Sequence, residues 1–234
     1  MPSMTDAGIP SCQESRREFR IFCVKVDWDW LIEMSMLAYT AILFLVFGAG
    51  CGDPPVANRH STGKTVICFG DSLTEGVGAS LGADYPSLLG RALGREVINA
   101  GSAGEVTADG LKRIERDVLS QNPKLVIVQF GGNDFMRGVP KKETFANLEE
   151  MVRRIQEAGA MVVLVGVQPG LIGDFTRSDY QRIARRRRAV FVPNILEGII
   201  TDPSLKSDTI HPNDAGYEKI AKRLLKAVRP LLEE

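Results

Sequence analysis

The sequence is poor in the residues that build metal sites and disulfide frameworks. Its 234 residues include only two histidines, His60 and His211, and four cysteines without a Cys-x-x-Cys pair. Neither a structural zinc site nor a disulfide framework is indicated. A surplus of charge is also lacking, because 29 basic residues balance 29 acidic ones. Without a positive field over the chain, nucleic acid is a poor candidate partner.

The sequence does contain enough apolar material for a packed domain, together with an unusual first segment. Hydrophobic residues make up 44% of the chain and charged residues 25%, which is typical of a soluble globular protein. Both tryptophans, Trp28 and Trp30, fall within the first 50 residues. Residues 34–50 carry no charge and end in small residues before Cys51. This layout is typical of the apolar core and cleavage site of a secretory signal.

The residues before Cys51 resemble the lipobox of bacterial lipoproteins, in which the cysteine becomes the lipidated first residue of the mature protein. Position 48 is glycine where leucine is usual, and the segment before the apolar run is long and acidic, so Met34 and Met36 remain alternative translation starts. The resemblance implies a lipid anchor at Cys51 and a periplasm-facing lipoprotein of the bacterial cell envelope. Gly52 in the next position favours the outer membrane. The alternatives are secretion or anchoring by an uncleaved segment, although the uncharged run of 17 residues spans only about 25 Å as a helix.

The composition divides the chain into three parts. Residues 1–50 are the expected leader, and residues 64–234 are the expected working domain. Residues 51–63 are rich in proline, glycine and small polar residues, which predicts a tether between the two.

Beyond residue 64, short apolar runs alternate with stretches of helical period. The predicted strands are 65–69, 96–99, 124–130, 160–166 and 189–192. The predicted helices are 84–93, 107–120, 142–158, 177–187 and 213–230. Because the strands are apolar throughout, helices are expected on both faces of a parallel sheet. The predicted fold class is α/β, a flavodoxin-like three-layer α/β/α sandwich with a five-stranded parallel sheet.

Four polar segments, 70–76, 99–105, 131–134 and 208–213, follow predicted strands, at the edge where open α/β sheets bind ligands. Serine, histidine and aspartate together activate a weak nucleophile, because the imidazole removes the serine proton and the carboxylate orients the imidazole. Since His60 falls in the tether, His211 is the candidate base, with Ser72 as nucleophile and Asp208 as orienting acid. The candidate donors to an oxyanion are the backbone N–H of Ser72, Gly104 and Asn133.

These four blocks resemble those of the SGNH, or GDSL, hydrolase family in order and spacing. They read FGDSLTEG, NAGSAGE, FGGND and SDTIHPNDAGY, and the similarity spans about residues 64–232. The flanking residues are most similar to the arylesterase, acyl-CoA thioesterase and lysophospholipase branch. The resemblance implies a serine esterase acting on ester or thioester bonds through an acyl-enzyme, with no metal or organic cofactor. It assigns the catalytic set to Ser72, Asp208 and His211, and the oxyanion hole to Ser72, Gly104 and Asn133.

Each motif alone also has a structural explanation. A Gly-Asp-Ser turn can shape a strand-to-helix connection, and Asp-x-x-His can cap a helix, but their joint order favours catalysis. Ser80 lies in a Gly-x-Ser-x-Gly sequence, which matches the nucleophile elbow of α/β-hydrolases. Because this sequence does not directly follow a predicted strand, we predict that Ser80 is a loop residue. Cys68, within the first strand, is predicted to be buried. The sequence differs from the arylesterase, acyl-CoA thioesterase and lysophospholipase branch at Glu105-Val106 and in region 167–188, which is shorter here. Both differences bear on the range of substrates.

Three alternative functions remain open at this point. One is a carbohydrate O-acetylesterase, and another is a lipoprotein that binds ligands without turnover. The third is a flavodoxin-like nucleotide-binding protein, which Asp71 and Glu75 disfavour because they would repel a phosphate at the first turn.

Two further features bear on substrate and partners. Phe135, Met136 and the loop 169–175 are candidates to line an acyl pocket, or are ordinary core beneath loops. The run 185–188, four arginines with Arg182 one turn earlier, is a solvated helix end or a contact for lipid phosphates. We therefore expect a small acyl ester or lipid substrate and a membrane reached through a lipid anchor, and leave the oligomeric state open.

Overall fold

The computed structural model describes residues 55–168 and 176–233, so the leader, Cys51 and the loop 169–175 lie outside the described residues. In chain order the elements are β1 (Thr65–Gly70), α2 (Ser72–Glu75), α3 (Tyr85–Leu93), β2 (Val97–Gly101), α4 (Thr107–Asp117), η1 (Leu119–Gln121), β3 (Pro123–Gln129), α5 (Gly132–Met136), α6 (Lys141–Glu157), β4 (Met161–Val165), α7 (Arg177–Arg187), β5 (Val190–Val192), η2 (Pro203–Leu205) and α8 (Asp214–Leu232). The strands form one parallel sheet in the order β2-β1-β3-β4-β5. The predicted α/β class, with five parallel strands, is confirmed.

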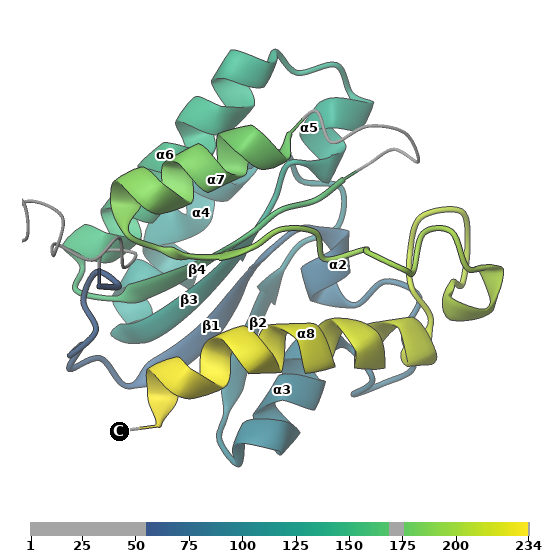
Figure 1. Ribbon diagram of the computed structural model, residues 1–234, viewed down its shortest axis with the longest axis horizontal. Helices are drawn as coiled ribbons and strands as arrows, with labels where there is room; N and C mark the ends of the chain where they lie inside the picture. Colours follow the sequence, from purple (N-terminus) through teal and green to yellow (C-terminus); the bar gives the residue numbers. More distant parts are fainter. Residues whose placement is uncertain (1–54, 169–175, 234) are drawn as a thin grey trace, which may run out of the picture. The chain divides into compact units, whose positions relative to one another are not determined.

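The sheet lies between two layers of helices (Figure 1), with α4, α6 and α7 on one face and α3 and α8 on the other. Alternate residues of each central strand pack against opposite faces of the sheet. In β1, Val66 and Cys68 pack in the core beneath α3 and α8, while Ile67 and Phe69 pack in the core beneath α4 and α6. A strand that is covered on both faces must be apolar at every position, which explains the uninterrupted apolar runs. Cys68 is buried as predicted, and burial raises the pKa of its thiol.

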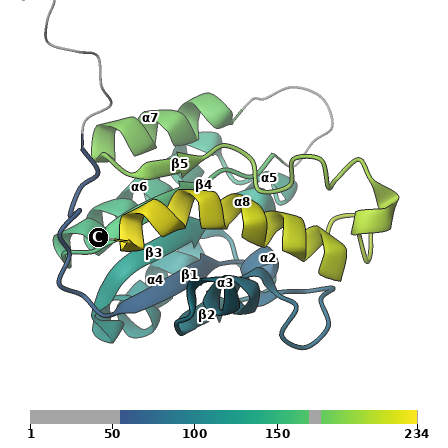
Figure 2. The same ribbon diagram turned by 60° about the horizontal axis from the view of Figure 1, so that its bottom comes forward.

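Local signals in the sequence fix where the helices begin and end. The side chain of Asp84 accepts a hydrogen bond from the backbone N–H of Ser87, and Gly94 ends α3 in the left-handed conformation. Asn213 caps α8 by accepting from the backbone N–H of Gly216. Figure 2 shows α8 lying along the sheet beside α3. The cap at Asn213 therefore fixes the start of α8 at Asp214, three residues after His211.

Two features of the fold were not predicted. The short helix α2 begins after the one residue that follows β1, and the short helix α5 begins after the two residues that follow β3; the sequence predicts only turns at these places. The edge strand β2 is half exposed, because it has only β1 as a neighbour in the sheet. Among the described residues, none of the helices combines the length and apolar character needed to cross a membrane.

The described part of the predicted tether contacts the domain at residues 56–59. Ala57 is buried, and Asn58 donates hydrogen bonds to the carbonyl oxygens of Gln156 and Ala160 at 2.8 and 2.9 Å. Arg59 donates to the carbonyl oxygens of two residues at the end of α8. Because Asn tolerates the left-handed conformation that Asn58 adopts (φ 58°), a polar stretch can make a fixed turn here. The compact unit extends over residues 53–234.

Candidate active site

The site begins at the turn between β1 and α2. Ser72 is the first residue of α2, and the side chain of Asp71 accepts a hydrogen bond from the backbone N–H of Leu73 at 3.1 Å. Gly70 is required before this turn, because a Cβ there would lie 2.0 Å from the Thr74 hydroxyl. The tight turn places the serine at the carboxyl edge of the sheet.

His211 reaches Ser72 from the other end of the chain. Its Nε2 lies 3.0 Å from the Ser72 hydroxyl, and its Nδ1 lies 2.7 Å from Oδ2 of Asp208. The other oxygen of Asp208 accepts hydrogen bonds from the backbone N–H groups of Ile210 and His211, both at 2.7 Å. The bonds from His211 and Ile210 lower the pKa of Asp208 to about 2, so it is a carboxylate throughout the neutral range. A charged carboxylate that accepts from Nδ1–H leaves Nε2 free to accept a proton from the serine.

The loop that carries this pair is held by its own backbone. Lys206 and Pro212 form an isolated antiparallel bridge, and the backbone N–H of Ser207 donates to the carbonyl oxygen of His211 at 2.9 Å. Asn213 adds a hydrogen bond from its side chain to the carbonyl oxygen of Ser204 at 2.9 Å. The loop is therefore a closed turn, and Asp208 and His211 lie within it.

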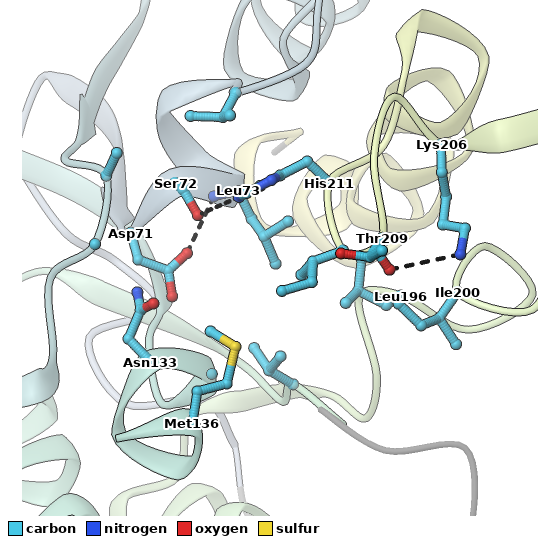
Figure 3. A pocket seen from close by; sticks show the side chains of 16 residues that line it. Asp71, Ser72, Leu73, Asn133, Met136, Leu196, Ile200, Lys206, Thr209 and His211 are labelled. Carbon is cyan, nitrogen blue, oxygen red and sulfur yellow. Dashed lines mark hydrogen bonds between the residues drawn. The ribbon is translucent and has the colours of Figure 1, made fainter. Parts of the chain in front are cut away.

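Gly104 and Asn133 line the same pocket as Ser72. Figure 3 shows Asn133 on the side of Ser72 away from Lys206. Gly104 has φ +78°, a conformation that turns the loop after β2 toward Ser72 and that glycine adopts without strain. Asn133 is 8% exposed, and its side-chain amide donates to the carbonyl oxygen of Glu105 at 2.9 Å. An amide has two N–H groups, so one holds Asn133 in place and the other is available to a ligand.

Asp71 is the other carboxyl group in the site. It is 2% exposed, and this burial raises its pKa to about 6, although the hydrogen bond from the backbone N–H of Leu73 favours the charged form. A buried carboxyl beside Ser72 is consistent with a cap for α2, because it holds the first turn through Leu73.

A pocket of about 460 Å³ opens beside Ser72 (Figure 3). Its apolar lining comes from α2 and the loop that follows it, from α5, and from the segments after β4 and β5; the residues are Leu73, Val77, Met136, Val167, Leu196, Ile200 and Ile210. An apolar cavity next to a hydroxyl nucleophile suits an acyl group. Across the described residues, no group of three or more His, Cys, Asp or Glu side chains gathers as metal ligands would.

Comparison with known proteins decides the family. The model of the GDSL-like Lipase/Acylhydrolase family matches residues 68–219. The chain belongs to this family. It is therefore a hydrolase of ester bonds, and the resemblance of the four blocks is confirmed.

Relatives of this GDSL-like hydrolase agree with that assignment. Esterase TesA of Pseudomonas aeruginosa is 29% identical over 196 residues, covering 79% of this chain and 97% of the relative. An arylesterase of Vibrio mimicus is 32% identical over 170 residues, covering 68% and 85%. A crystal structure of TesA superimposes with a TM-score of 0.65 at 26% identity, covering 72% of this chain and 99% of that one.

Two residues of the GDSL-like hydrolase that support the site were missed in the sequence. Arg113 on α4 donates to the Glu105 carboxylate at 2.6 Å, and the Glu75 carboxylate accepts from the backbone N–H of Ala103. Both therefore hold the loop that contains Gly104. The departure at Glu105 is thus explained by a contact with α4, and neither Glu105 nor Val106 lines the pocket.

Met136 lines the pocket, whereas Phe135 lines a separate cavity of about 190 Å³. Ser80 is an exposed loop residue as predicted.

Part of the arginine-rich end of α7 is neutralised within the GDSL-like hydrolase. Arg186 and Arg187 pair with Glu149 at 3.0 and 3.1 Å, and Arg182 pairs with Asp179. These three arginines are therefore engaged with acidic side chains, which favours the solvated helix end over a dedicated lipid contact.

Proposed function

We propose that the enzyme hydrolyses acyl esters or thioesters through an acyl-enzyme on Ser72. The Ser72 hydroxyl attacks the carbonyl carbon while His211 Nε2 takes its proton, and Asp208 stabilises the resulting imidazolium. The backbone N–H of Ser72 and Gly104 and the side chain of Asn133 donate to the oxyanion. His211 then protonates the departing alcohol or thiol. A water molecule that loses its proton to His211 releases the acid and restores Ser72.

The observation that carries this proposal is the unbroken chain of short contacts from serine to carboxylate. Ser72 Oγ and His211 Nε2 are 3.0 Å apart, and His211 Nδ1 and Asp208 are 2.7 Å apart. Both distances are within the range in which a general base acts on a hydroxyl group. A lipoprotein that only bound ligands would not need this alignment.

The lining of the pocket supports acyl groups longer than acetyl. Its apolar residues come from four separate segments, and a cavity of about 460 Å³ exceeds what an acetyl group fills. We therefore expect kcat/KM to rise from acetyl to butyryl esters, by roughly three- to fourfold for each CH₂ that becomes buried. A carbohydrate O-acetylesterase would show the opposite order, with acetylated sugars preferred over butyryl esters.

Hydrolysis of p-nitrophenyl acetate, butyrate and octanoate, and of matching thioesters, tests the proposal. Ser72→Ala should lower kcat by about 10³-fold or more, because the nucleophile is lost. Ser80→Ala is the matched control, since Ser80 is exposed and does not line the pocket. Equal rates for Ser72→Ala and the wild type would overturn the proposal.

We further propose that the mature protein begins at a lipidated Cys51 and resides in the bacterial cell envelope, where the lipid anchors it in the outer membrane. The uncharged run 34–50 and the lipobox-like residues before Cys51 support this. In cells fed a labelled fatty acid, Cys51→Ala should lose the label and Cys12→Ala should retain it. Label retained by Cys51→Ala would contradict the anchor and leave secretion or an uncleaved segment.

A further inference from the structure

One end of the substrate pocket is positively charged. Lys206 and Thr209 line the same cavity as Ser72 and Met136. Figure 3 shows Lys206 on the side of His211 that lies away from Asn133, close to Ile200. The cavity thus leads from the serine, past an apolar wall, to an ammonium group.

The backbone of Lys206 is fixed, whereas its charge has no strong partner. The residue forms the bridge with Pro212, and Asn213 donates to its carbonyl oxygen at 3.4 Å. The ammonium group reaches only the carbonyl oxygen of Thr209, at 3.5 Å, which is the outer limit of a hydrogen bond. Within the part of the chain that the structure describes, Lys206 forms no ion pair. Its charge is therefore available to a ligand.

The chemistry of the site determines which half of the substrate meets Lys206. His211 Nε2 protonates the leaving oxygen or sulfur, so the alcohol or thiol half must lie beside His211. The oxyanion lies on the other side, at Gly104 and Asn133. Lys206 and Thr209 belong to the same closed turn as His211, so a group attached to the departing alcohol extends toward them.

The two acidic groups nearby do not cancel this charge. Asp71 is buried at the opposite end of the pocket. The carboxylate of Asp208 is hydrogen-bonded to the backbone N–H and to the ring Nδ1 of His211. Asp208 does not line the pocket.

We propose that Lys206 forms a subsite for a negatively charged group, a carboxylate or a phosphate, on the alcohol or thiol half of the substrate. This inference rests on the proposed function. It names the class of substrate as acyl esters or thioesters with an anionic leaving group.

Two esters of the same shape test the subsite directly. The butyrate ester of 4-hydroxybenzoate carries a carboxylate where the butyrate ester of methyl 4-hydroxybenzoate carries a neutral group. The measurement is the ratio of kcat/KM for the anionic ester to that for the neutral ester. Lys206→Met should lower this ratio about two- to fivefold, as expected for one partly exposed ion pair, and Lys206→Glu should lower it further. Added salt should lower the ratio of the wild type more than that of Lys206→Met.

Lys226→Met is the matched control, because Lys226 is an exposed lysine of α8 that does not line the pocket. Its ratio should equal that of the wild type. A ratio unchanged by Lys206→Met, with both esters hydrolysed, overturns the subsite and leaves the proposed function intact. Failure of the wild type to hydrolyse either ester overturns the proposed function itself. A Lys206-dependent preference for p-nitrophenyl hemisuccinate over p-nitrophenyl butyrate would move the anion to the acyl half and contradict the assignment made here.

Discussion

The guanidinium of Arg113 donates a hydrogen bond of 3.0 Å to the carbonyl oxygen of Gly70, two residues before Ser72. The same side chain donates to the carbonyl oxygen of Ala100 at 3.0 Å and to the carboxylate of Glu105 at 2.6 Å. It also lies over the ring of Phe69. One side chain of α4 therefore fixes the distance between the serine turn and the loop that contains Gly104.

Arg113→Met should lower kcat by roughly tenfold to a hundredfold while KM changes little. The reason is positional, because small shifts of a donor relative to a nucleophile are costly in the transition state. Steady-state kinetics on p-nitrophenyl butyrate, well below the unfolding temperature, measures the effect. Lys112→Met is the control, since Lys112 is an exposed neighbour of Arg113 that pairs with Asp109. A folded Arg113→Met enzyme with the kcat of the wild type would contradict this role.

Asp208→Asn should lower kcat by about 10²- to 10⁴-fold with KM largely retained. The amide cannot stabilise an imidazolium, and it favours the wrong tautomer of His211. Because the pKa of Asp208 is lowered to about 2, its titration does not shape the pH profile between pH 4 and 9. Steady-state kinetics on p-nitrophenyl butyrate at neutral pH measures the loss. A folded Asp208→Asn enzyme with the kcat of the wild type would contradict the role of Asp208 as the orienting carboxylate.

Asp71→Asn should raise stability at neutral pH more than at pH 4. The folded-state pKa of Asp71 is about 6, against a usual value of 3.8, because the group is buried. A raised carboxyl pKa means that the folded state binds the proton more tightly, so stability is lost as pH rises from about 4 to 6. Asparagine avoids this loss and keeps the cap on Leu73, so the variant should gain up to about 3 kcal/mol over this interval relative to wild type.

Denaturant unfolding of both proteins at pH 4, 5, 6 and 7 measures the difference. A difference in unfolding free energy that stays constant across these pH values would show that Asp71 has an ordinary pKa.

Asn58→Gly should lower the free energy of unfolding by about 1–2 kcal/mol and leave kcat unchanged. Glycine keeps the left-handed backbone but removes the two hydrogen bonds to Gln156 and Ala160. Asn58→Ala should cost more, because it adds backbone strain to the same loss. Equal stability of Asn58→Gly and wild type would mean that residues 56–59 are only a tether.

The sequence predicted the sheet and the polar edge well because both depend on short-range patterns. Apolar runs such as that of β3 can only be buried on two faces, and polar residues after a parallel strand must lie at one edge. The grouping of Ser72, Asp208 and His211 followed from that topology and from the scarcity of histidine. Their contacts agree with the grouping.

What the sequence could not predict depends on long side chains that cross between elements. Arg113 resembles any other charged residue of an amphipathic helix, and only the packed structure brings it to Gly70 and Ala100. Asn58 is a turn residue in a polar stretch, and its two long-range hydrogen bonds leave no local signal. The position of Lys206 in the pocket likewise could not be predicted, because it depends on a turn that is closed by the bridge between Lys206 and Pro212.

The most direct test of the account is the detection of the acyl-enzyme itself. Wild-type protein mixed with p-nitrophenyl butyrate should release a burst of p-nitrophenol, and acid quenching should trap a butyryl group on the peptide that contains Ser72. Ser72→Ala should show neither the burst nor the modified peptide. A butyryl group found on another residue, or turnover by Ser72→Ala at the wild-type rate, would contradict the assignment of Ser72 as the nucleophile.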